Sequence, residues 1–327
     1  MSPTRGPGSG SGPGAGTGAG TGPGPGLGGG PDGGSGSLVA DLAGAVDRLS
    51  AAGVPTPRTD AELLAAHAAG TDRGGLQRLV VMRAGWPDGA ARRFAALVSE
   101  RADRVPLQHL TGRAPFRGIE LAVGPGVFLP RPETELLAGA AVAELLHLIR
   151  QGLGHPVAID LCTGSAAVAL AVVDEVPTAR VGAVELDPHA HAWAERNAEA
   201  LGGGRLELHQ GDVVDAAGLM PSFVAACHVV TANPPYIPDD AVPVEAEVAE
   251  HDPPVALFGG PDGLRVLRVC VDVAAVLLRP GGLLVLEHGE PQCDGVAAVL
   301  ARAGGWTDVA HHPDLTGRPR LTTARRP

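Results

Sequence analysis

The sequence lacks most features that mark secreted, metal-binding or membrane-spanning proteins. It has only four cysteines, scattered without a Cys-x-x-Cys pair, so neither a disulfide framework nor a zinc site is indicated. No apolar run is long enough to span a bilayer, and the amino terminus lacks the basic-then-apolar pattern of a secretion signal. From these absences we expect a cytoplasmic location, no metal and no membrane partner.

Basic residues are also scarce. Lysine and arginine number 25 against 36 aspartates and glutamates, which gives a net charge of -11. Such a balance argues against a protein that holds a nucleic-acid backbone over a wide face, so we expect no direct nucleic-acid partner. Hydrophobic residues make up 44% of the chain, enough to fill the cores of two modest domains.

The composition changes near residue 37. Residues 1–36 are dominated by Gly, Pro, Ser and Thr and have almost nothing to bury, which predicts a disordered tail. Apolar residues then recur at helical spacing from Leu38 to Leu49, and residues 61–69, 76–82 and 90–97 suggest more short helices. We therefore predict a small helical domain over residues 37–112. A linker over residues 113–131 follows, in which residues 116–129 alternate like a β-hairpin.

From residue 132 to residue 327, apolar strands alternate with helices. Strands are expected at residues 157–161, 181–184, 205–209, 228–232 and 282–287, and helices at residues 166–173, 188–201, 263–278 and 291–303. Two late strands, residues 306–310 and 320–324, are joined by a short loop and should pair antiparallel. The pattern predicts an α/β fold with a doubly wound sheet of about seven strands.

The motif Asn233-Pro234-Pro235-Tyr236 follows the strand expected at residues 228–232. It should therefore lie at a strand's carboxyl end, where ligands bind in open α/β sheets. The Asn233 side-chain oxygen and the Pro234 carbonyl are two acceptors, and Tyr236 adds a flat face, so the motif suits a planar amide or amine. Two acceptors hold an NH2 by its protons and leave the nitrogen lone pair facing an electrophile.

The electrophile's site is predicted upstream. The strand at residues 157–161 leads into a turn over residues 162–165, and the next strand ends at Glu185, where nucleoside-binding folds place the acid that holds ribose hydroxyls. The turn alone also fits an ordinary strand-to-helix connection, but Glu185 and the Asn233 motif favour a nucleoside. No phosphate-binding motif is present, which favours S-adenosylmethionine, a ligand that needs no phosphate cradle.

These motifs resemble those of the HemK/PrmC-type methyltransferases, which modify the glutamine side-chain amide of peptide chain release factors. The resemblance runs from about Leu38 to the C-terminus, and its most specific stretch is Arg131-Pro132-Glu133-Thr134-Glu135. Other matching stretches are residues 106–112, 116–121, 160–165, 233–238, 251–253, 256–260, 262–264 and 279–282. The resemblance implies a class I, Rossmann-like methyltransferase domain that acts on the Gly-Gly-Gln motif of release factors, with S-adenosylmethionine as cofactor.

The resemblance also implies a role for each matching position. Cofactor contacts fall on Cys162, Thr163, Gly164, Ser165, Ala166, Glu185, Asp212, Val213 and Asn233. Substrate contacts fall on Arg131, Glu133, Asn233, Pro234, Pro235 and Tyr236, with Asn233, Pro234 and Tyr236 closest to the reaction. We assign no general base, because a sulfonium methyl is already a strong electrophile and the proton can leave after transfer.

One departure from the family pattern concerns the cofactor loop. Members usually carry glycine at the position of Ala166, and often at that of Cys162. Glycine in such a loop permits a positive φ or a close ligand. We therefore expect Ala166 either to crowd the cofactor or to cost about 1 kcal/mol in backbone strain.

Three other interpretations stay open at the level of sequence. An adenine-N6 nucleic-acid methyltransferase shares the Asn-Pro-Pro-Tyr motif, although the charge balance opposes it. The others are a glutamine methyltransferase with another protein substrate and a non-enzymatic protein that keeps the fold. The acidic residues Glu245, Glu247 and Glu250 fit a solvated helix and a substrate entrance equally well. By contrast, His189, His191, His311 and His312 are expected on solvated surface rather than at a metal.

Overall fold

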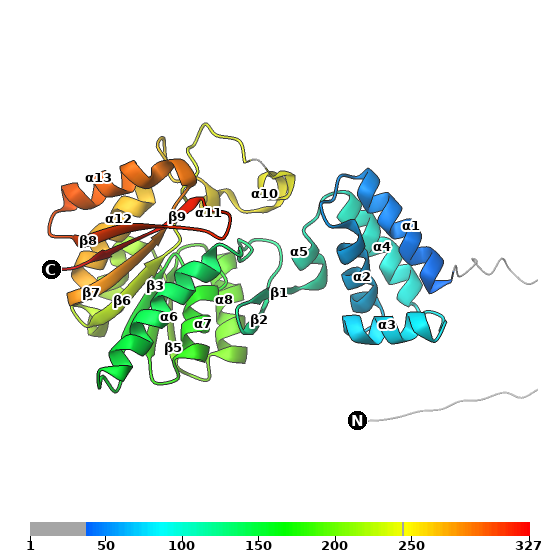
Figure 1. The fold of residues 1–327 in the computed structure, drawn as a ribbon, viewed down its shortest axis with the longest axis horizontal. Helices are drawn as coiled ribbons and strands as arrows, with labels where there is room; N and C mark the ends of the chain where they lie inside the picture. Colours follow the sequence, from blue (N-terminus) through cyan, green and yellow to red (C-terminus); the bar gives the residue numbers. More distant parts are fainter. Residues whose placement is uncertain (1–36, 244) are drawn as a thin grey trace, which may run out of the picture. The chain divides into compact units, whose positions relative to one another are not determined.

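The computed structural model describes residues 37–243 and 245–327, so the predicted disorder of residues 1–36 lies outside the described residues. The first part of the described chain is helical (Figure 1). Its helices are α1 (Leu38–Ala51), α2 (Pro57–Ala68), α3 (Arg73–Val81), α4 (Ala90–Ala102) and α5 (Leu107–Thr111). Their apolar stripes pack into one core that includes Leu49, Leu64 and Phe94.

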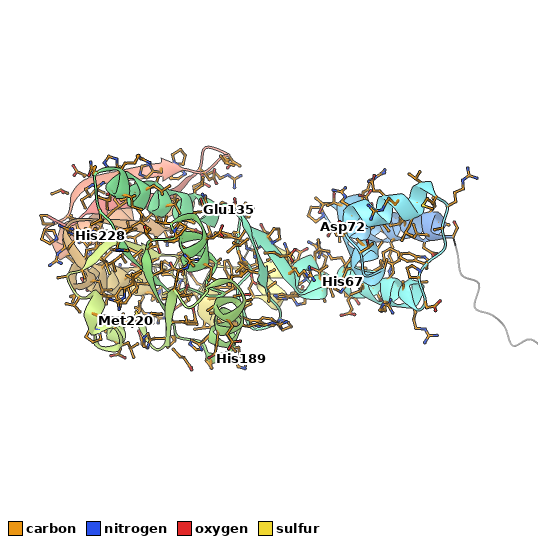
Figure 2. The ribbon with its side chains drawn as sticks, turned by 90° about the horizontal axis from the view of Figure 1, so that it is seen from below. His67, Asp72, Glu135, His189, Met220 and His228 are labelled. Atoms are coloured by element: carbon orange, nitrogen blue, oxygen red, sulfur yellow. The ribbon has the colours of Figure 1, made fainter. Side chains whose placement is uncertain are left out.

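Side-chain caps explain where two of these helices begin. Ser37 accepts a hydrogen bond from the Ala40 N–H at the start of α1. Asp72, which Figure 2 labels, accepts one from the Gly75 N–H at the start of α3. Each cap satisfies an amide that has no partner inside its own helix.

The hairpin after these helices is shorter and earlier than predicted. Strands β1 (Arg113–Phe116) and β2 (Ile119–Ala122) pair antiparallel, so the expected hairpin across residues 116–129 was wrong in its extent. The two-residue turn at Arg117 and Gly118, with Arg117 at φ +51°, sets the register. Glycine and proline at residues 124–126 then prevent a longer second strand. The domain limits at residues 37–112, 113–131 and 132–327 stay predictions.

The rest of the chain forms the predicted doubly wound sheet of seven strands. These are β3 (Val157–Leu161), β4 (Arg180–Glu185), β5 (Leu206–Gln210), β6 (Cys227–Ala232), β7 (Leu278–Glu287), β8 (Thr307–Pro313) and β9 (Pro319–Arg325). Their order is β5-β4-β3-β6-β7-β9-β8. Strands β3 to β7 pair in parallel, and β9 pairs antiparallel with both β7 and β8, as the sequence predicted for the two late strands.

Helices cover both faces of this sheet (Figure 1). Neighbouring residues of β3 show the division, because Ala158 belongs to one core and Ile159 to the other. The first core is shared with α6 (Thr134–Arg150), α7 (Ala167–Glu175) and α8 (Pro188–Leu201). The second is shared with α9 (Ala216–Leu219), α12 (Arg265–Leu277) and α13 (Cys293–Ala303). Helix α6 was not predicted.

Among the helices of residues 37–243 and 245–327, none is long and apolar enough to cross a membrane.

Candidate active site

A pocket of about 890 Å³ lies at the carboxyl ends of β3, β4, β6 and β7. The strand order reverses between β3 and β6, which is where open α/β sheets bind their ligands. The pocket collects most of the residues predicted from the sequence: Arg131, Glu133, Cys162, Thr163, Gly164, Ser165, Glu185, Asp212, Val213, Asn233, Pro235 and Tyr236. Of the predicted set, Ala166 and Pro234 are buried and do not line it. The specific role given to each residue stays a prediction.

The loop after β3 is held by its own polar groups. The Thr163 hydroxyl donates to the Asp160 carboxylate at 2.6 Å, and the Gly164 N–H donates to Glu185 at 2.7 Å. Asp160 also accepts from the Thr231 hydroxyl at 2.7 Å, so one buried carboxylate ties β3 to β6. Burial raises the pKa of Asp160 to about 6, against the opposing effect of these hydrogen bonds. The sequence reading did not single out Asp160.

Two non-glycine residues of the loop, Cys162 and Ala166, have left-handed backbone. Cys162 lies at φ +57° and Ala166 at φ +65°, at the two positions where the resembling family carries glycine. Ala166 is the residue before α7, and its methyl group is buried away from the pocket. The expected crowding of the cofactor is therefore not what the structure shows. The left-handed conformation of Ala166 instead indicates backbone strain, the other effect expected from the sequence.

Glu185 ends β4 with its carboxylate at the pocket. Its two oxygens accept from the N–H groups of Gly164, at 2.7 Å, and Asp187, at 2.9 Å. Burial raises the pKa of Glu185, and these backbone hydrogen bonds oppose the rise. A buried carboxylate at this strand end can accept from a ribose diol and also fix the loop beneath it.

The next strand end supplies Asp212 and Val213. The Asp212 side chain accepts from the Val214 N–H at 3.0 Å and starts a short 3-10 turn over Val213–Asp215. Val213 is buried and lines the pocket, so it offers an apolar wall beside the Glu185 carboxylate. A nucleobase needs such a wall on one face.

The Asn-Pro-Pro-Tyr motif follows β6 directly. Asn233 donates from Nδ2 to the Thr134 hydroxyl at 3.2 Å, which turns its oxygen to the other side. The Tyr236 carbonyl accepts from the Gln292 side chain at 2.9 Å. A side chain at Gly263 would meet that same carbonyl at 2.2 Å, so this position requires glycine. Burial raises the pKa of Tyr236, so its hydroxyl stays protonated.

Arg131 closes the pocket on the side of the segment before α6. Its guanidinium lies 5.1 Å from the centre of the Phe128 ring and donates to the buried Asp252 carboxylate at 2.8 Å. Glu245 lies 3.7 Å from a second guanidinium nitrogen. Arg131, a predicted substrate contact, is thus fixed to the segment that follows the Asn-Pro-Pro-Tyr motif.

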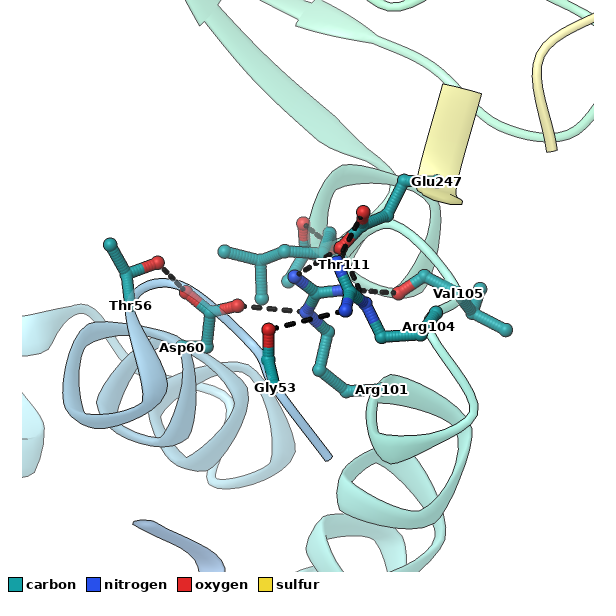
Figure 3. A network of polar contacts seen from close by, with 9 residues as sticks. Gly53, Thr56, Asp60, Arg101, Arg104, Val105, Thr111 and Glu247 are labelled. Atoms are coloured by element: carbon teal, nitrogen blue, oxygen red, sulfur yellow. Dashed lines mark hydrogen bonds and ion pairs between the residues drawn. The ribbon is translucent and has the colours of Figure 1, made fainter. Parts of the chain in front are cut away.

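That segment also reaches the helical part of the chain. Glu247, in α10 (Ala246–His251), accepts from Arg101 and Arg104, and Arg101 is also bound to Asp60 at 2.8 Å (Figure 3). Burial favours a higher pKa for Glu247, but the hydrogen bonds outweigh it and bring the pKa to about 2. Of the two open interpretations of the acidic residues, a fully solvated helix does not fit Glu247.

Three potential metal-ligating atoms, from His288, Cys293 and His311, lie within 4.8 Å of one another. His311 is exposed, in line with the expected surface position. Thr322 lies between the two rings, with its hydroxyl oxygen 2.8 Å from a nitrogen of each. This hydroxyl therefore already pairs the two ring nitrogens.

Besides Asp160, the polar pocket residues Thr134, Glu287 and Arg320 were not singled out from the sequence. Glu287 is the last residue of β7 and is 2% exposed. The rule that found Glu185, an acid at the carboxyl end of a parallel strand, applies to Glu287 as well. Thr134 lay inside the most specific matching stretch but has no chemistry that marks it alone. Arg320 reaches the pocket from β9, a contact that no local pattern encodes.

Comparisons with known proteins identify the family. A family model described as the PrmC N-terminal domain matches residues 42–112. The release factor glutamine methyltransferase of Streptomyces coelicolor is 46% identical over 291 residues, covering 88% of this chain and 98% of that protein. The protein of that name from Mycolicibacterium smegmatis is 47% identical over 285 residues, covering 87% and 96%.

A relative with another substrate is also similar. The 4-amino-L-phenylalanine/4-methylamino-L-phenylalanine methyltransferase of Streptomyces pristinaespiralis is 38% identical and covers 85% of this chain and 91% of its own length. Among solved structures, the Mtq2-Trm112 complex of E. cuniculi is 22% identical with a TM-score of 0.41, covering 62% of this chain and 99% of that one. On the strength of the sequence relatives, this chain belongs to the release factor glutamine methyltransferase family.

Proposed function

We propose that this protein transfers a methyl group from S-adenosylmethionine to the side-chain amide nitrogen of the glutamine in the Gly-Gly-Gln motif of peptide chain release factors. The observation that carries the proposal is that Asn233 and Glu185 line one pocket in a chain of this family. A cytoplasmic location accords with this substrate, because translation takes place there.

The residues of the pocket fit S-adenosylmethionine. Glu185 offers a buried carboxylate for the ribose hydroxyls, and Val213 offers an apolar wall for the adenine. Residues 162–165 form the floor that the methionine part would cover. When bound, S-adenosylmethionine supplies an electrophilic methyl carbon. The protein then has to hold the acceptor nitrogen in line and keep water out.

The Asn-Pro-Pro-Tyr motif supplies the acceptor side. A carboxamide nitrogen is a poor nucleophile, because its lone pair is delocalised into the carbonyl. A hydrogen bond from one of its protons to the Asn233 oxygen polarises the NH2 and favours the charge that develops as the new bond forms. The part predicted for the Pro234 carbonyl would require its exposure on substrate binding, because Pro234 is buried and does not line the pocket. The neutral Tyr236 ring walls the amide plane. In this mechanism no protein side chain has to act as a general base, because the proton can leave the nitrogen after methyl transfer.

A second candidate substrate has a specific observation in its favour. The Streptomyces pristinaespiralis relative is named for an arylamine, which also presents an NH2 on a planar group. The motif alone does not separate an arylamine from a glutamine amide. The relatives named for release factors share more identity with this chain, 46% and 47% against 38%, and this favours the protein substrate.

The test is a substrate comparison with labelled S-adenosylmethionine. The natural chain and Asn233→Ala are each given a purified release factor, the same factor with the motif glutamine replaced, 4-amino-L-phenylalanine, and duplex DNA. Label on the natural factor alone, lost with either replacement, supports the proposal. Label on the arylamine alone or on DNA moves the assignment to amine or adenine-N6 methylation. No label on any of them refutes methyl transfer to these substrates.

A further inference from the structure

Glu287 is a pocket carboxylate to which the proposed function assigns no role. It ends β7, lines the pocket beside the Asn-Pro-Pro-Tyr motif and is 2% exposed. Within the described residues, its Oε2 atom has no hydrogen-bond partner. A buried carboxylate with an unpaired oxygen is costly, so its retention beside the motif calls for a function.

The polar neighbours of Glu287 connect it to Asn233. Burial raises the pKa of Glu287 to about 7, and polar contacts with the side chains of Thr134 and Asn233 oppose the rise. Two charged groups act on Glu287: Glu133 raises its pKa and Arg320 lowers it. The charge of Glu287 in turn raises the pKa of Tyr236. These groups come from the segment before α6, from β9 and from the motif itself.

Thr134 shows the direction of the hydrogen bonds. Its hydroxyl oxygen accepts from the Asn233 Nδ2 at 3.2 Å. The hydroxyl's own proton is then free to be donated to the Glu287 carboxylate, which only accepts when it is ionised. Acceptors therefore lie on the Nδ2 side of Asn233. The Asn233 oxygen is left for the opposite side, where the substrate NH2 has to bind.

We propose that Glu287 is a positioning residue that, with Thr134, fixes the side-chain amide of Asn233 so that its oxygen faces the substrate nitrogen. This inference rests on the proposed function, because it assigns Asn233 the part of acceptor. If the Asn233 amide turned over, it would offer its own NH2 to the substrate NH2, and two donors repel. Because the Asn233 amide is held in one orientation before the substrate binds, it does not have to turn over during the reaction.

The ionised form of Glu287 is the one that holds Asn233. A protonated Glu287 has an O–H to donate, and that donor can satisfy the Asn233 oxygen in the wrong orientation. The rate of methyl transfer should therefore rise with pH as Glu287 loses its proton. Glu287→Gln has the same shape and carries a permanent donor, so it should lose both rate and this pH step.

The experiment measures single-turnover methyl transfer to a release factor between pH 5.5 and pH 9. It uses the natural chain, Glu287→Gln, Thr134→Val, and Glu290→Gln as an exposed control next to the same strand end. We expect Glu287→Gln to be about 10- to 100-fold slower at pH 8, with cofactor affinity by calorimetry within about twofold. The control should keep both rate and pH step. A Glu287→Gln enzyme with the natural rate and pH step overturns the proposal.

A second readout does not need turnover. The side-chain amide resonances of Asn233, measured by nitrogen-15 NMR, should shift with pH through the Glu287 titration in the natural chain and stay still in Glu287→Gln. If no release factor is methylated but these resonances follow Glu287, the proposed substrate fails and the Glu287–Asn233 coupling stands. If they do not follow Glu287, the positioning role is refuted whatever the substrate.

Discussion

Arg104 grips Glu247 with two nitrogens, Nε at 2.9 Å from one carboxylate oxygen and Nη2 at 2.6 Å from the other (Figure 3). Arg104 follows α4, in the part of the chain that matches the PrmC N-terminal domain model, and Glu247 lies in the segment after the Asn-Pro-Pro-Tyr motif. Glu245 and Val248, on either side of Glu247, line the pocket. The paired hydrogen bonds thus join the helical part to one wall of the pocket.

Glu247→Gln should loosen this wall. We expect KM for the protein substrate to rise about 3- to 10-fold while the cofactor Kd is unchanged, because the segment touches the substrate side of the pocket. Glu250→Gln, an exposed change on the same short helix, is the matched control and should alter neither constant. Steady-state kinetics with a release factor, together with calorimetry of the cofactor, measure both. An effect on cofactor Kd equal to that on KM would argue against a substrate-side role.

The same contact has a defined pH range. The pKa of the Glu247 carboxyl group, about 2, lies below the usual 4.5. The stability that Glu247 contributes is therefore present above about pH 4.5 and is lost as the pH falls toward 2. The natural chain should be more stable than Glu247→Gln by about 1–3 kcal/mol at pH 7, because Glu247 is partly buried. Urea unfolding at pH 7 and pH 3 measures the difference, which should shrink at the lower pH.

Ala166→Gly should stabilise the protein. The residue lies at φ +65° and its methyl group does not line the pocket, so glycine removes strain and leaves the cofactor site unchanged. We expect a gain of about 1 kcal/mol in the free energy of unfolding. Ala169→Gly, inside α7, is the matched control and should lose about 1 kcal/mol. Equal losses in both variants would show that Ala166 is not strained.

Glu287→Gln should be more stable than the natural chain at neutral pH. The raised pKa means that folding favours the protonated form, so the stability linked to Glu287 is full below pH 4.5 and is lost as the pH rises through about 7. At pH 8 the free energy of unfolding of the variant should exceed that of the natural chain by up to about 3 kcal/mol. The cost of burying the new amide reduces this gain. Unfolding free energies at pH 5 and pH 8 test this. A variant that is less stable at pH 8 than at pH 5, relative to the natural chain, would contradict it.

Glu185→Ala should weaken cofactor binding. Its carboxylate both faces the pocket and holds the loop through the Gly164 N–H, so its loss removes a ribose acceptor and frees the loop. We expect the S-adenosylmethionine Kd to rise about 10- to 100-fold, as for loss of hydrogen bonds to a charged group. Glu207→Ala, whose carboxylate pairs with Arg180 away from the pocket, is the control. Calorimetry that finds both variants alike would remove Glu185 from the cofactor site.

The sequence was most informative where chemistry and periodicity coincide. Strands β3, β4 and β6 end on Leu161, Glu185 and Ala232, and their apolar runs and the residues that follow them marked the pocket in advance. The positive φ at Cys162 and Ala166 was also foreseeable, because glycine at the matching positions of the family indicates that backbone conformation.

Contacts between distant segments were out of reach of local patterns. Helix α6 was missed because its apolar residues run on without a clear polar face, as is usual for a helix buried on a sheet. Asn233 and Thr134 are separated by 99 residues, and Arg104 and Glu247 by 143. No spacing rule predicts such pairs, and it is these pairs that set the orientation of Asn233 and fix the wall of the pocket.

The most direct test of the account is to locate the methyl group on its acceptor. A release factor treated with the natural chain and S-adenosylmethionine is digested and its peptides are sequenced by mass spectrometry. We predict a single added methyl on the side chain of the Gly-Gly-Gln glutamine, absent after treatment with Asn233→Ala. A methyl on any other residue, or none while the protein still binds the cofactor, would contradict it.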